Sequence, residues 1–359
     1  MKLAISTGGG DAPGLNAVIR AVVLSAYDRG WECVGIRRGF HGIYDGSGLV
    51  TLDPEAVRGI THLGGTILGT TNRGNPFRWP VTQPDGSVIE IDRSPDLIAA
   101  FKREKIDALV SIGGDGSLTI AAQLNAMGLP VVGVPKTIDN DVWGTETTFG
   151  FDTAVSTATE ALDKLHTTTE AHDRVMVVEL MGRDAGWIAL HSGISGTADV
   201  ILIPEIPFSM DKVAEHILQR EQRGRHFAIV VVAEGARTVD GGPVFLERRG
   251  AGTNDRLGGM GEQVAAAIAQ RTGKETRSLV LGHLQRGGSP TTFDRLLALR
   301  FGSAAVRAIA EGDFGTMVAY RPPNIERVPL GEVLGRSKLV PVDSGVILTA
   351  RHLGISFGD

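Results

Sequence analysis

Two segments of the chain carry side chains that could transfer a phosphoryl group. The first, Pro135-Lys-Thr-Ile-Asp-Asn-Asp141, follows an apolar run and supplies a cation, a hydroxyl and two carboxylates. Transfer to an alcohol needs a base for the hydroxyl proton and positive charge near the transferring oxygens. Asp139 is therefore a candidate base, with Thr137 and Lys136 beside the phosphoryl group. The alternative is that Asp139 and Asp141 only cap a helix or shape a turn.

The second segment, Ile112-Gly-Gly-Asp-Gly-Ser117, lies where an apolar run meets a helix-like pattern. A turn at such a place presents free backbone N–H groups and the positive end of a helix dipole, which together suit a phosphate. Asp115 would repel that phosphate unless a cation lay between them, which indicates Mg²⁺ bound to a nucleotide or another polyphosphate. Because this turn precedes the first segment by one strand, we favour catalysis over capping for Asp139.

Similar turns follow other apolar runs. Gly8-Gly-Gly10 precedes a helical pattern and is either a second anion-binding turn or a connection without a ligand. Met181-Gly-Arg183 is a third strand-to-helix junction, and Arg174 flanks its strand. Arg73 in the glycine-rich loop 63–75 could reach a phosphate or be solvated.

Charged side chains in the second half of the chain predict a site for the acceptor. Arg277, His283 and Arg286 indicate a second phosphate, one that belongs to the acceptor and is not transferred. Glu205 and Glu234 each follow an apolar strand, at the end where open α/β sheets bind ligands. Either glutamate could accept hydrogen bonds from sugar hydroxyls or be a buried acid paired with an arginine.

These residues need parallel strands that end at one edge. A strand at residues 2–6, a helix over 17–24 and a strand at 31–36 make a β-α-β unit and hence a parallel sheet. Asp85-Gly86 among prolines predicts a surface hairpin within 76–94, and 243–261 is predicted as an exposed connection. Other strands are predicted over 107–112, 130–134, 199–205 and 227–235 and from residues 174 and 276, and helices over 153–168, 256–271 and 293–311, with a change of domain near 150.

The composition indicates a soluble globular protein and excludes several classes. A chain of 359 residues, 42% hydrophobic and 21% charged, fits two domains of ordinary size. A net charge of −5 without a basic run argues against nucleic acid as a partner. No apolar stretch reaches the roughly 20 residues that cross a bilayer, and the first residues resemble a strand rather than a signal peptide. The single Cys33 excludes an intrachain disulfide, so we expect a cytoplasmic protein without a membrane partner.

The motifs, in their order along the chain, resemble those of the 6-phosphofructokinase family. The resemblance runs from residue 3 to about 310 and rests on Gly8-Gly-Gly-Asp-Ala-Pro-Gly-Leu-Asn16, Gly113-Gly-Asp-Gly-Ser117, Pro135-Lys-Thr-Ile-Asp-Asn-Asp141, Met181-Gly-Arg183, Pro204-Glu205 and Gly282-His-Leu-Gln-Arg-Gly-Gly288. It implies two Rossmann-like three-layer αβα lobes with mainly parallel sheets and an active-site cleft between them. The larger lobe, which binds the donor, would comprise 1–150 and about 285–335, and the smaller lobe, which binds the sugar phosphate, 151–284 and about 336–359.

The resemblance also implies the reaction and a role for each motif position. A glycolytic kinase of this family transfers the γ-phosphoryl group of ATP to the 1-hydroxyl of fructose 6-phosphate. The implied catalytic residues are Asp139 as general base with Thr137, Arg183 and Lys136 around the phosphoryl group, and Asp115 would hold Mg²⁺. The implied donor contacts are Gly10, Arg73, Gly114, Asp115, Gly116 and Ser117. The implied sugar-phosphate contacts are Thr137, Ile138, Asp139, Arg174, Met181, Gly182, Arg183, Glu234, Arg277, His283, Leu284, Gln285 and Arg286. In the family the counterparts of Arg174 and Arg277 come from a neighbouring subunit, which implies a homotetramer.

Two positions bear on the donor. At the positions of residues 116 and 136, family members that use ATP typically have glycine and glycine, whereas those that use pyrophosphate typically have aspartate and lysine. This chain has Gly116 with Lys136, a combination that resembles the mixed-substrate branch. An aspartate at position 116 would repel an α-phosphate, and its absence leaves room for the nucleotide, so we predict ATP. The alternative is a pyrophosphate-dependent fructose 6-phosphate 1-phosphotransferase.

Two further positions bear on regulation. Allosterically regulated bacterial members carry arginines where this chain has Leu24 and Leu63. A leucine cannot bind the phosphate of an effector, so we predict weak or absent activation by ADP and inhibition by phosphoenolpyruvate.

Two more distant functions remain as alternatives. An NAD kinase also uses a Gly-Gly-Asp-Gly turn, but it does not need the Met-Gly-Arg and His-Leu-Gln-Arg-Gly-Gly motifs. A non-catalytic sugar-phosphate sensor on the same fold would not need Asp139 and Asp115, both of which are present. A nicotinamide dehydrogenase is disfavoured because the first turn lacks Gly-x-Gly-x-x-Gly.

Overall fold

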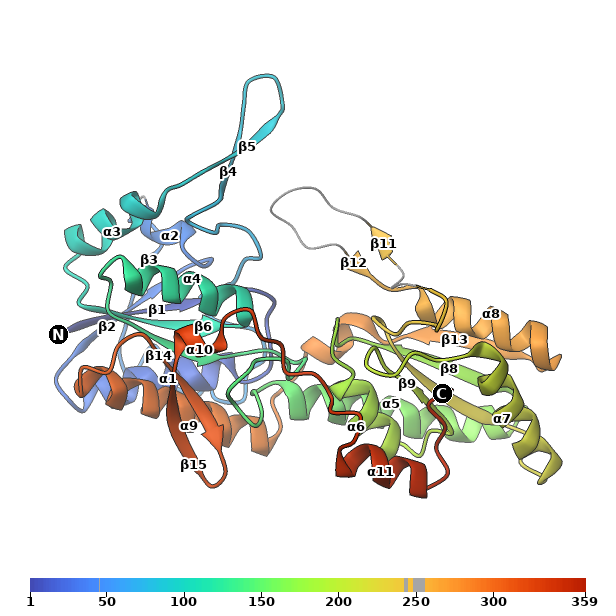
Figure 1. Cartoon of the computed structure of the whole chain (residues 1–359). Coiled ribbons are helices and arrows are strands. Elements are labelled where there is room, and N and C mark those ends of the chain that lie inside the picture. The colour runs from blue at the N-terminus through green and yellow to red at the C-terminus, as the bar shows by residue number, and fades with distance from the viewer. Residues whose placement is uncertain (45, 242–244, 248–255) are drawn as a thin grey trace.

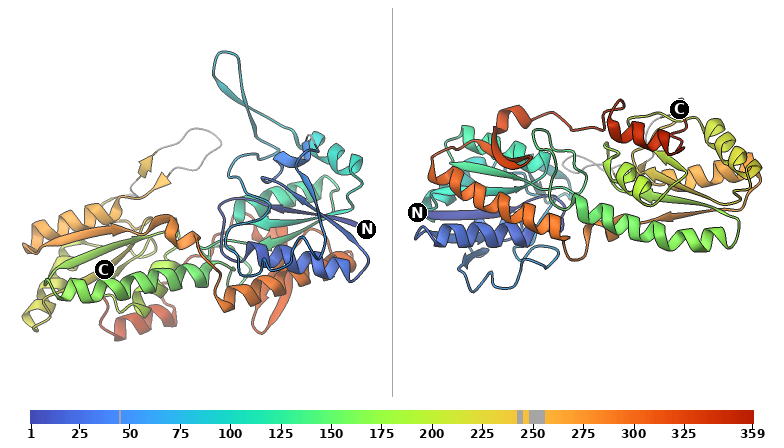
Figure 2. Two further views of the ribbon diagram at one scale, coloured as in Figure 1. Left: turned by 180° about the vertical axis from the view of Figure 1, so that it is seen from behind. Right: turned by 90° about the horizontal axis from the view of Figure 1, so that it is seen from below.

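The chain folds into two mainly parallel sheets, each with helices on both faces. The computed structural model describes residues 1–44, 46–241, 245–247 and 256–359. The two sheets lie side by side along the long dimension of the molecule, and the views of Figures 1 and 2 agree on this arrangement. The predicted α/β class is therefore confirmed.

The larger sheet has β6 at its centre, with β1 and β7 on either side. Within the described residues it is parallel except at its two edges, where β3 and β15 run antiparallel to their neighbours. In spatial order its strands are β15 (Asn324–Pro329), β14 (Thr316–Arg321), β7 (Val131–Pro135), β6 (Ala108–Gly113), β1 (Lys2–Thr7), β2 (Glu32–Ile36) and β3 (Leu49–Leu52).

Alternating side chains fill both faces of this sheet. Leu3 and Ile5 of β1 join the hydrophobic cluster on one face, and Ala4 joins the cluster on the other, as the two-residue period of a strand requires. The first cluster includes residues of α1 (Leu15–Tyr27) and α9 (Thr292–Ala310). The second includes residues of α2 (His41–Tyr44), α3 (Ser94–Arg103), α4 (Asp115–Ala126) and α10 (Leu330–Val333).

The smaller sheet repeats this arrangement with four parallel strands. In spatial order they are β13 (Thr276–Val280), β8 (Val175–Leu180), β10 (Ala228–Ala233) and β9 (Val200–Leu202). One face packs against α5 (Phe151–Glu170), α6 (Trp187–Ser195) and α11 (Gly345–His352). The other packs against α7 (Met210–Gln222) and α8 (Met260–Thr272). The five residues of η1 (Gly282–Arg286), a 3-10 helix, follow β13.

Two predicted surface segments contain antiparallel strand pairs, and the first of them confirms a predicted hairpin. The predicted hairpin within 76–94 is present as β4 (Trp79–Thr82) and β5 (Val88–Ile91), which project from the body in Figure 1. The predicted connection 243–261 contains an antiparallel pair, β11 (Phe245–Glu247) and β12 (Arg256–Leu257), while 243–244 and 248–255 lie outside the described residues.

The predicted bounds of two elements are wrong, and one hairpin was not predicted. The helix predicted from 256 begins at Met260, because Gly259 adopts a positive φ of 88° and the preceding residues form a strand. The strand predicted over 199–205 ends at Leu202, shortly before Pro204, which cannot donate a ladder hydrogen bond. The hairpin of β14 and β15 was not predicted.

The sheets bear on two other expectations. Strands of the larger sheet come from residues 2–135 and 316–329, and those of the smaller sheet from 175–280; the exact lobe boundaries stay a prediction. None of the helices in the described part of the chain is long and apolar enough to span a bilayer.

Candidate active site

The predicted site residues follow strands at which the chain reverses the order in which it adds strands to a sheet. In the larger sheet the chain moves from β1 to β2 on one side and returns through β6 on the other, so the turns after β1 and β6 face each other. In the smaller sheet β8 stands between β10 and β13, and the motifs at 181–183 and 282–286 follow β8 and β13. Open α/β sheets bind ligands at such switch points.

Ser117 sits between the two glycine turns of the larger sheet. A Cβ added at Gly8 would lie 2.6 Å from Ser117 Oγ, and one added at Gly113 would lie 2.2 Å from Ser117 Cβ. Side chains at either glycine would therefore displace the first turn of α4. In contrast, a Cβ at Gly116 would meet nothing within 4 Å, so the space beside this helix terminus is open, as a bound donor would need.

Asp139 lies buried among cationic side chains from both sheets. Its side chain is only 4% exposed, and its Oδ1 atom has no hydrogen-bond partner among the residues described. Burial raises the pKa of Asp139, while Arg286, Arg183 and Lys136 oppose that rise. A carboxylate in this environment can accept a proton yet remain ionised beside the cations, which is what a general base requires.

Lys136 and Arg286 link the catalytic segment to the first glycine turn. The Lys136 Nζ atom donates to the carbonyl oxygen of Gly10, and the Arg286 Nη1 atom donates to that of Asp11 over 3.3 Å. Burial lowers the pKa of Lys136 to about 8. Burial, and then the neighbouring Asp139, raise the pKa of Asp141 to about 6. The structure thus brings residues 10, 136, 139 and 286 together.

Arg183 and Glu234 form the part of the site that the smaller sheet supplies. The Glu234 Oε1 atom accepts a hydrogen bond of 3.1 Å from the backbone N–H of Arg183, which has a left-handed φ of 50°. A Cβ at Gly235 would lie 1.9 Å from the Arg183 carbonyl oxygen, so glycine is required for this close approach. Burial raises the pKa of Glu234 to about 7, and the other candidate glutamate, Glu205, accepts from the backbone N–H groups of Gly186 and Val340.

The raised pKa of Glu234 predicts that ionisation of this carboxyl lowers the stability of the folded protein. The folded chain holds a proton on this carboxyl that the unfolded chain releases above its ordinary pKa of 4.5, so stability falls as the pH rises from about 4.5 to about 7. Glu234→Gln should therefore stabilise the substrate-free protein at pH 8 by about 1–3 kcal/mol. Thermal unfolding measured at pH 5 and pH 8 should show that the gain shrinks at pH 5, and a variant less stable than the wild type at pH 8 would contradict the assignment.

Arg174 and Arg277 lie away from the other predicted site residues. Both ion-pair with Glu275, with distances of 3.0 Å from Arg174 Nε and 2.8 Å from Arg277 Nη2 to the same carboxylate oxygen. Arg174 precedes β8, whereas Arg183 follows it. Six strand residues span about 20 Å, so these two arginines do not reach the site of their own chain.

The remaining predicted contacts vary in how they face solvent. His283 and Leu284 are exposed, whereas Gln285 is buried and its Nε2 atom donates to the carbonyl oxygen of Gly282 over 3.1 Å. Ile138 is wholly buried in the core of the smaller sheet, so any ligand contact it makes must come from its backbone. Met181 packs against the same core, beside Gly182.

The exposed Arg73 lies in a loop that contacts the first glycine turn. The backbone N–H of Gly9 donates to the carbonyl oxygen of Thr71 over 3.1 Å. The hydroxyl of Thr70 donates to the carbonyl oxygen of Gly9. The loop that carries Arg73 therefore packs against the first glycine turn, and a contact of Arg73 with the donor stays a prediction.

Sequence reasoning missed two residues that support the site. Asn140 is buried with a positive φ of 54°, and the Lys338 Nζ atom donates to its Oδ1 atom over 3.2 Å. Asn140 was visible as part of a motif, and asparagine tolerates this conformation. Lys338 is 198 residues further along the chain, and no local pattern marked it.

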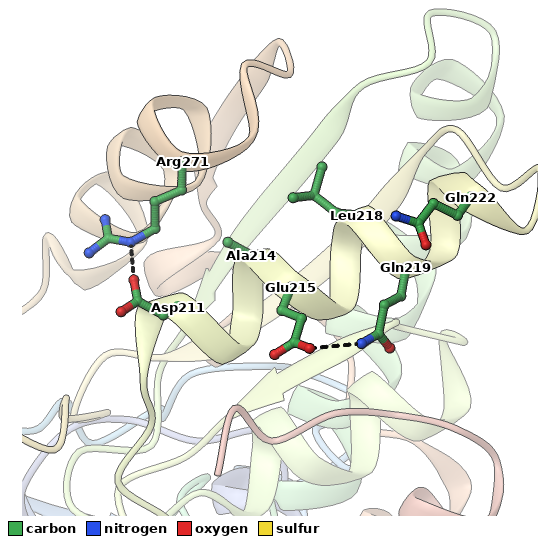
Figure 3. A pocket seen from close by; sticks show the side chains of 7 residues that line it. All are labelled: Asp211, Ala214, Glu215, Leu218, Gln219, Gln222 and Arg271. Atoms are coloured by element: carbon green, nitrogen blue, oxygen red, sulfur yellow. Dashed lines mark hydrogen bonds and ion pairs between the residues drawn. The ribbon is translucent and has the colours of Figure 1, made fainter.

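An open pocket elsewhere on the surface contains none of the predicted site residues. It has a volume of about 560 Å³ and is lined by Arg271 of α8 and by side chains of α7 (Figure 3). The Arg271 Nε atom is already paired with Asp211 over 2.8 Å. We therefore assign no chemistry to this pocket.

Comparisons with known proteins bear on the family and its donors. Residues 2–309 match the family model described as Phosphofructokinase. The chain is 50% identical over 360 residues to the ATP-dependent 6-phosphofructokinase of Chloroflexus aurantiacus, with 100% of this chain and 98% of that protein covered. It is also 50% identical over 343 residues to the pyrophosphate–fructose 6-phosphate 1-phosphotransferase of Amycolatopsis methanolica, with 95% and 96% covered.

A solved structure shows the same fold in a longer chain. The phosphofructokinase of Pichia pastoris in the T-state superposes with a TM-score of 0.79 at 34% identity. The alignment covers 92% of this chain and 35% of that one, so this chain spans about a third of its length. The match of the family model over most of the chain, together with relatives at 50% identity over nearly their full length, shows that the chain belongs to the phosphofructokinase family.

Proposed function

We propose that this chain is an ATP-dependent 6-phosphofructokinase of glycolysis, which transfers the γ-phosphoryl group of ATP to the 1-hydroxyl of fructose 6-phosphate. One observation carries the proposal. The Oδ1 atom of the buried Asp139 has no hydrogen-bond partner among the described residues, and the cationic Arg286, Arg183 and Lys136 favour the ionised form of its carboxyl. A buried polar atom without a partner is costly unless a ligand completes its hydrogen bonds.

The proposed reaction uses Asp139 as the base. Its carboxylate accepts the proton of the 1-hydroxyl while that oxygen bonds to the γ-phosphorus and ADP leaves. Arg183 and Thr137 stabilise the charge on the transferring oxygens, and the Thr137 hydroxyl also accepts the backbone N–H of Asp139 over 3.0 Å. Arg286, with His283 and Glu234, would hold the sugar phosphate.

We propose Mg²⁺ as the metal that accompanies the nucleotide. No group of three or more His, Cys, Asp or Glu side chains in the described ranges could hold a metal ion unaided. Mg²⁺ commonly takes one or two carboxylates and completes its shell with water and substrate phosphates. Asp115, the first residue of α4, supplies such a carboxylate, and partial burial raises its pKa. When bound, the ion would neutralise charge on the phosphate oxygens.

The donor decides between this function and its alternative. Formation of fructose 1,6-bisphosphate should be measured with ATP and with pyrophosphate in parallel, at matched concentrations with Mg²⁺. Activity with ATP alone would support the proposal, and activity with pyrophosphate would favour the phosphotransferase that the Amycolatopsis relative represents. Product with neither donor would leave a sugar-phosphate sensor as the better reading.

Two leucines at positions where regulated relatives carry effector-binding arginines lead to a prediction about regulation. Leu24, a residue of α1, packs against the core of the larger sheet, and Leu63 is 43% exposed; neither side chain can pair with a phosphate. We expect ADP and phosphoenolpyruvate at millimolar concentrations to change the KM for fructose 6-phosphate by less than about threefold. Steady-state titrations with both effectors test this, and a sigmoidal response that either effector shifts strongly would overturn it.

We further propose a cytoplasmic homotetramer. Arg174 and Arg277 stand side by side at the far end of the smaller sheet, and β13 is an edge strand whose Leu279 and Val280 side chains are exposed. An exposed apolar edge strand is a surface that proteins usually cover. Light scattering at assay concentrations tests the assembly.

A further inference from the structure

A crossover segment, residues 334–344, connects the two sheets through contacts beside the active site. It runs from α10 on the larger sheet to α11 on the smaller one (Figure 1). The backbone N–H of Lys338 donates to the carbonyl oxygen of Asp141 over 2.9 Å, and Ser337 forms an antiparallel bridge with Val142. The segment therefore pairs with the backbone that directly follows Asp139 and Asn140.

The same segment is fixed to the smaller sheet. The Trp187 Nε1 atom donates to the carbonyl oxygen of Lys338 over 2.8 Å. The backbone N–H of Val340 donates to the Glu205 Oε1 atom over 2.9 Å. With both neighbours tied down, the backbone of Lys338 has little freedom to move, and its side chain starts from a fixed point.

The Lys338 side chain turns toward the catalytic loop. Its Nζ atom donates to Asn140 Oδ1 over 3.2 Å and to the carbonyl oxygen of Glu146, and it lies 5.0 Å from the centre of the Trp187 ring. Burial lowers the pKa of Lys338 to about 8, while Glu146 and Asp141 oppose that shift. The charged or titratable groups that face it are Glu146, Asp141 and His191.

Asn140 accepts this hydrogen bond and directly follows the proposed base in the chain. It is 4% exposed, has a left-handed φ of 54°, and its Oδ1 atom also accepts the backbone N–H of Thr148 over 3.2 Å. The Asn140 amide thus joins the loop 137–148 to the crossover segment. A shift at Asn140 would rotate the peptide that orients Asp139.

We propose that Lys338 is a positioning residue, which holds Asn140 and through it the carboxylate of Asp139. This inference rests on the proposed function of Asp139 as the base. Misplacement of a reacting group by about 1 Å can lower a rate by about 10²-fold. Removing one of several contacts to the loop should have a smaller effect, and it should act on the chemical step more than on substrate binding.

The variant Lys338→Met removes the donor and keeps the length of the side chain. We expect kcat to fall by about tenfold or more while the KM values for ATP and fructose 6-phosphate change by less than about threefold. Lys274→Met is the matched control, because the Lys274 side chain is also largely buried and pairs with Glu221 over 2.6 Å, but it lies just before β13 and away from this loop. Equal kcat values for the two variants would overturn the proposal.

A double-mutant cycle tests whether Lys338 acts through Asn140. Asn140→Gly removes the amide and tolerates the left-handed backbone. If the proposal holds, adding Lys338→Met to this variant lowers kcat no further, because the contact is already absent. Additive losses would mean that Lys338 acts by another route, and would overturn it.

Hydrogen–deuterium exchange of the substrate-free protein separates this inference from the proposed function. Lys338→Met should speed exchange in residues 137–148 and leave the helices of the smaller sheet unchanged. Unchanged exchange in 137–148 would overturn the inference whatever the enzyme activity. A wild type that forms no product with ATP or pyrophosphate would remove the proposed function, and exchange alone would then decide whether Lys338 orders this loop.

Discussion

Asp139→Asn should lower kcat for fructose 1,6-bisphosphate formation by about 10²–10⁴-fold, the usual cost of losing a general base. The amide keeps the shape of the side chain but cannot accept the hydroxyl proton. Because the cationic neighbours Lys136, Arg183 and Arg286 remain, the KM for fructose 6-phosphate should change little or fall. Steady-state kinetics with saturating ATP measure both parameters.

A second buried aspartate provides the control for this substitution. Asp294 is also buried, and burial raises its pKa to about 6, but its Oδ2 atom accepts hydrogen bonds from the backbone and hydroxyl of Thr153. Asp294→Asn should therefore affect stability more than turnover. Near-normal kcat in Asp139→Asn would remove Asp139 from the role of base.

Much of the larger sheet could be predicted because its strands are short apolar runs that end in glycine turns. The runs that become β1, β6 and β7 are buried on both faces, so hydrophobic residues continue without alternation and the turn residues mark where each strand ends. Carboxyl ends of parallel strands meet at one edge. The approach of Gly10, Lys136 and Asp139 was therefore readable from the order of the motifs.

The edges of the fold were less predictable because their strands are only partly buried. Strand β15 reads Asn324-Ile-Glu-Arg-Val-Pro329, in which only Val328 is fully buried, and it pairs with β14 alone. The hairpin itself is local, but β14 pairs with the distant β7, and a single sequence does not reveal such long-range pairing. The same reason hid Lys338, whose contact with Asn140 exists only once both sheets and the crossover segment are in place.

The site also shows which residues a motif can place and which it cannot. Arg174 and Arg183 flank the same strand in the sequence, yet they lie at opposite ends of β8, and only the family resemblance implied that Arg174 and Arg277 serve the site of a neighbouring subunit. The order of residues along the chain does not by itself predict which end of a strand lies at the active site. Glu205 and Glu234 both follow an apolar strand in the sequence. In the structure, Glu205 accepts backbone N–H groups from the crossover segment and from Gly186 just before α6, whereas Glu234 accepts that of Arg183.

The donor position leads to a second large effect. Gly116→Asp should lower kcat/KM for ATP by about 10²-fold while leaving, or raising, activity with pyrophosphate. Two unit charges about 5 Å apart at an effective dielectric constant of about 20 repel by about 3 kcal/mol, which corresponds to about that factor. The new carboxylate would stand beside Asp115, close to the proposed position of the α-phosphate of ATP. Pyrophosphate has no α-phosphate, so it would not meet this repulsion.

The structure indicates that this variant will fold. A Cβ at position 116 meets nothing within 4 Å, and an aspartate in the first turn of α4 interacts favourably with the helix dipole. Gly116→Asn is the matched control, since it has the same shape without the charge. If both variants lose ATP activity equally, steric contact rather than charge explains the loss. If Gly116→Asp keeps its activity with ATP, then Gly116 does not select the donor, and Lys136 becomes the residue to replace next.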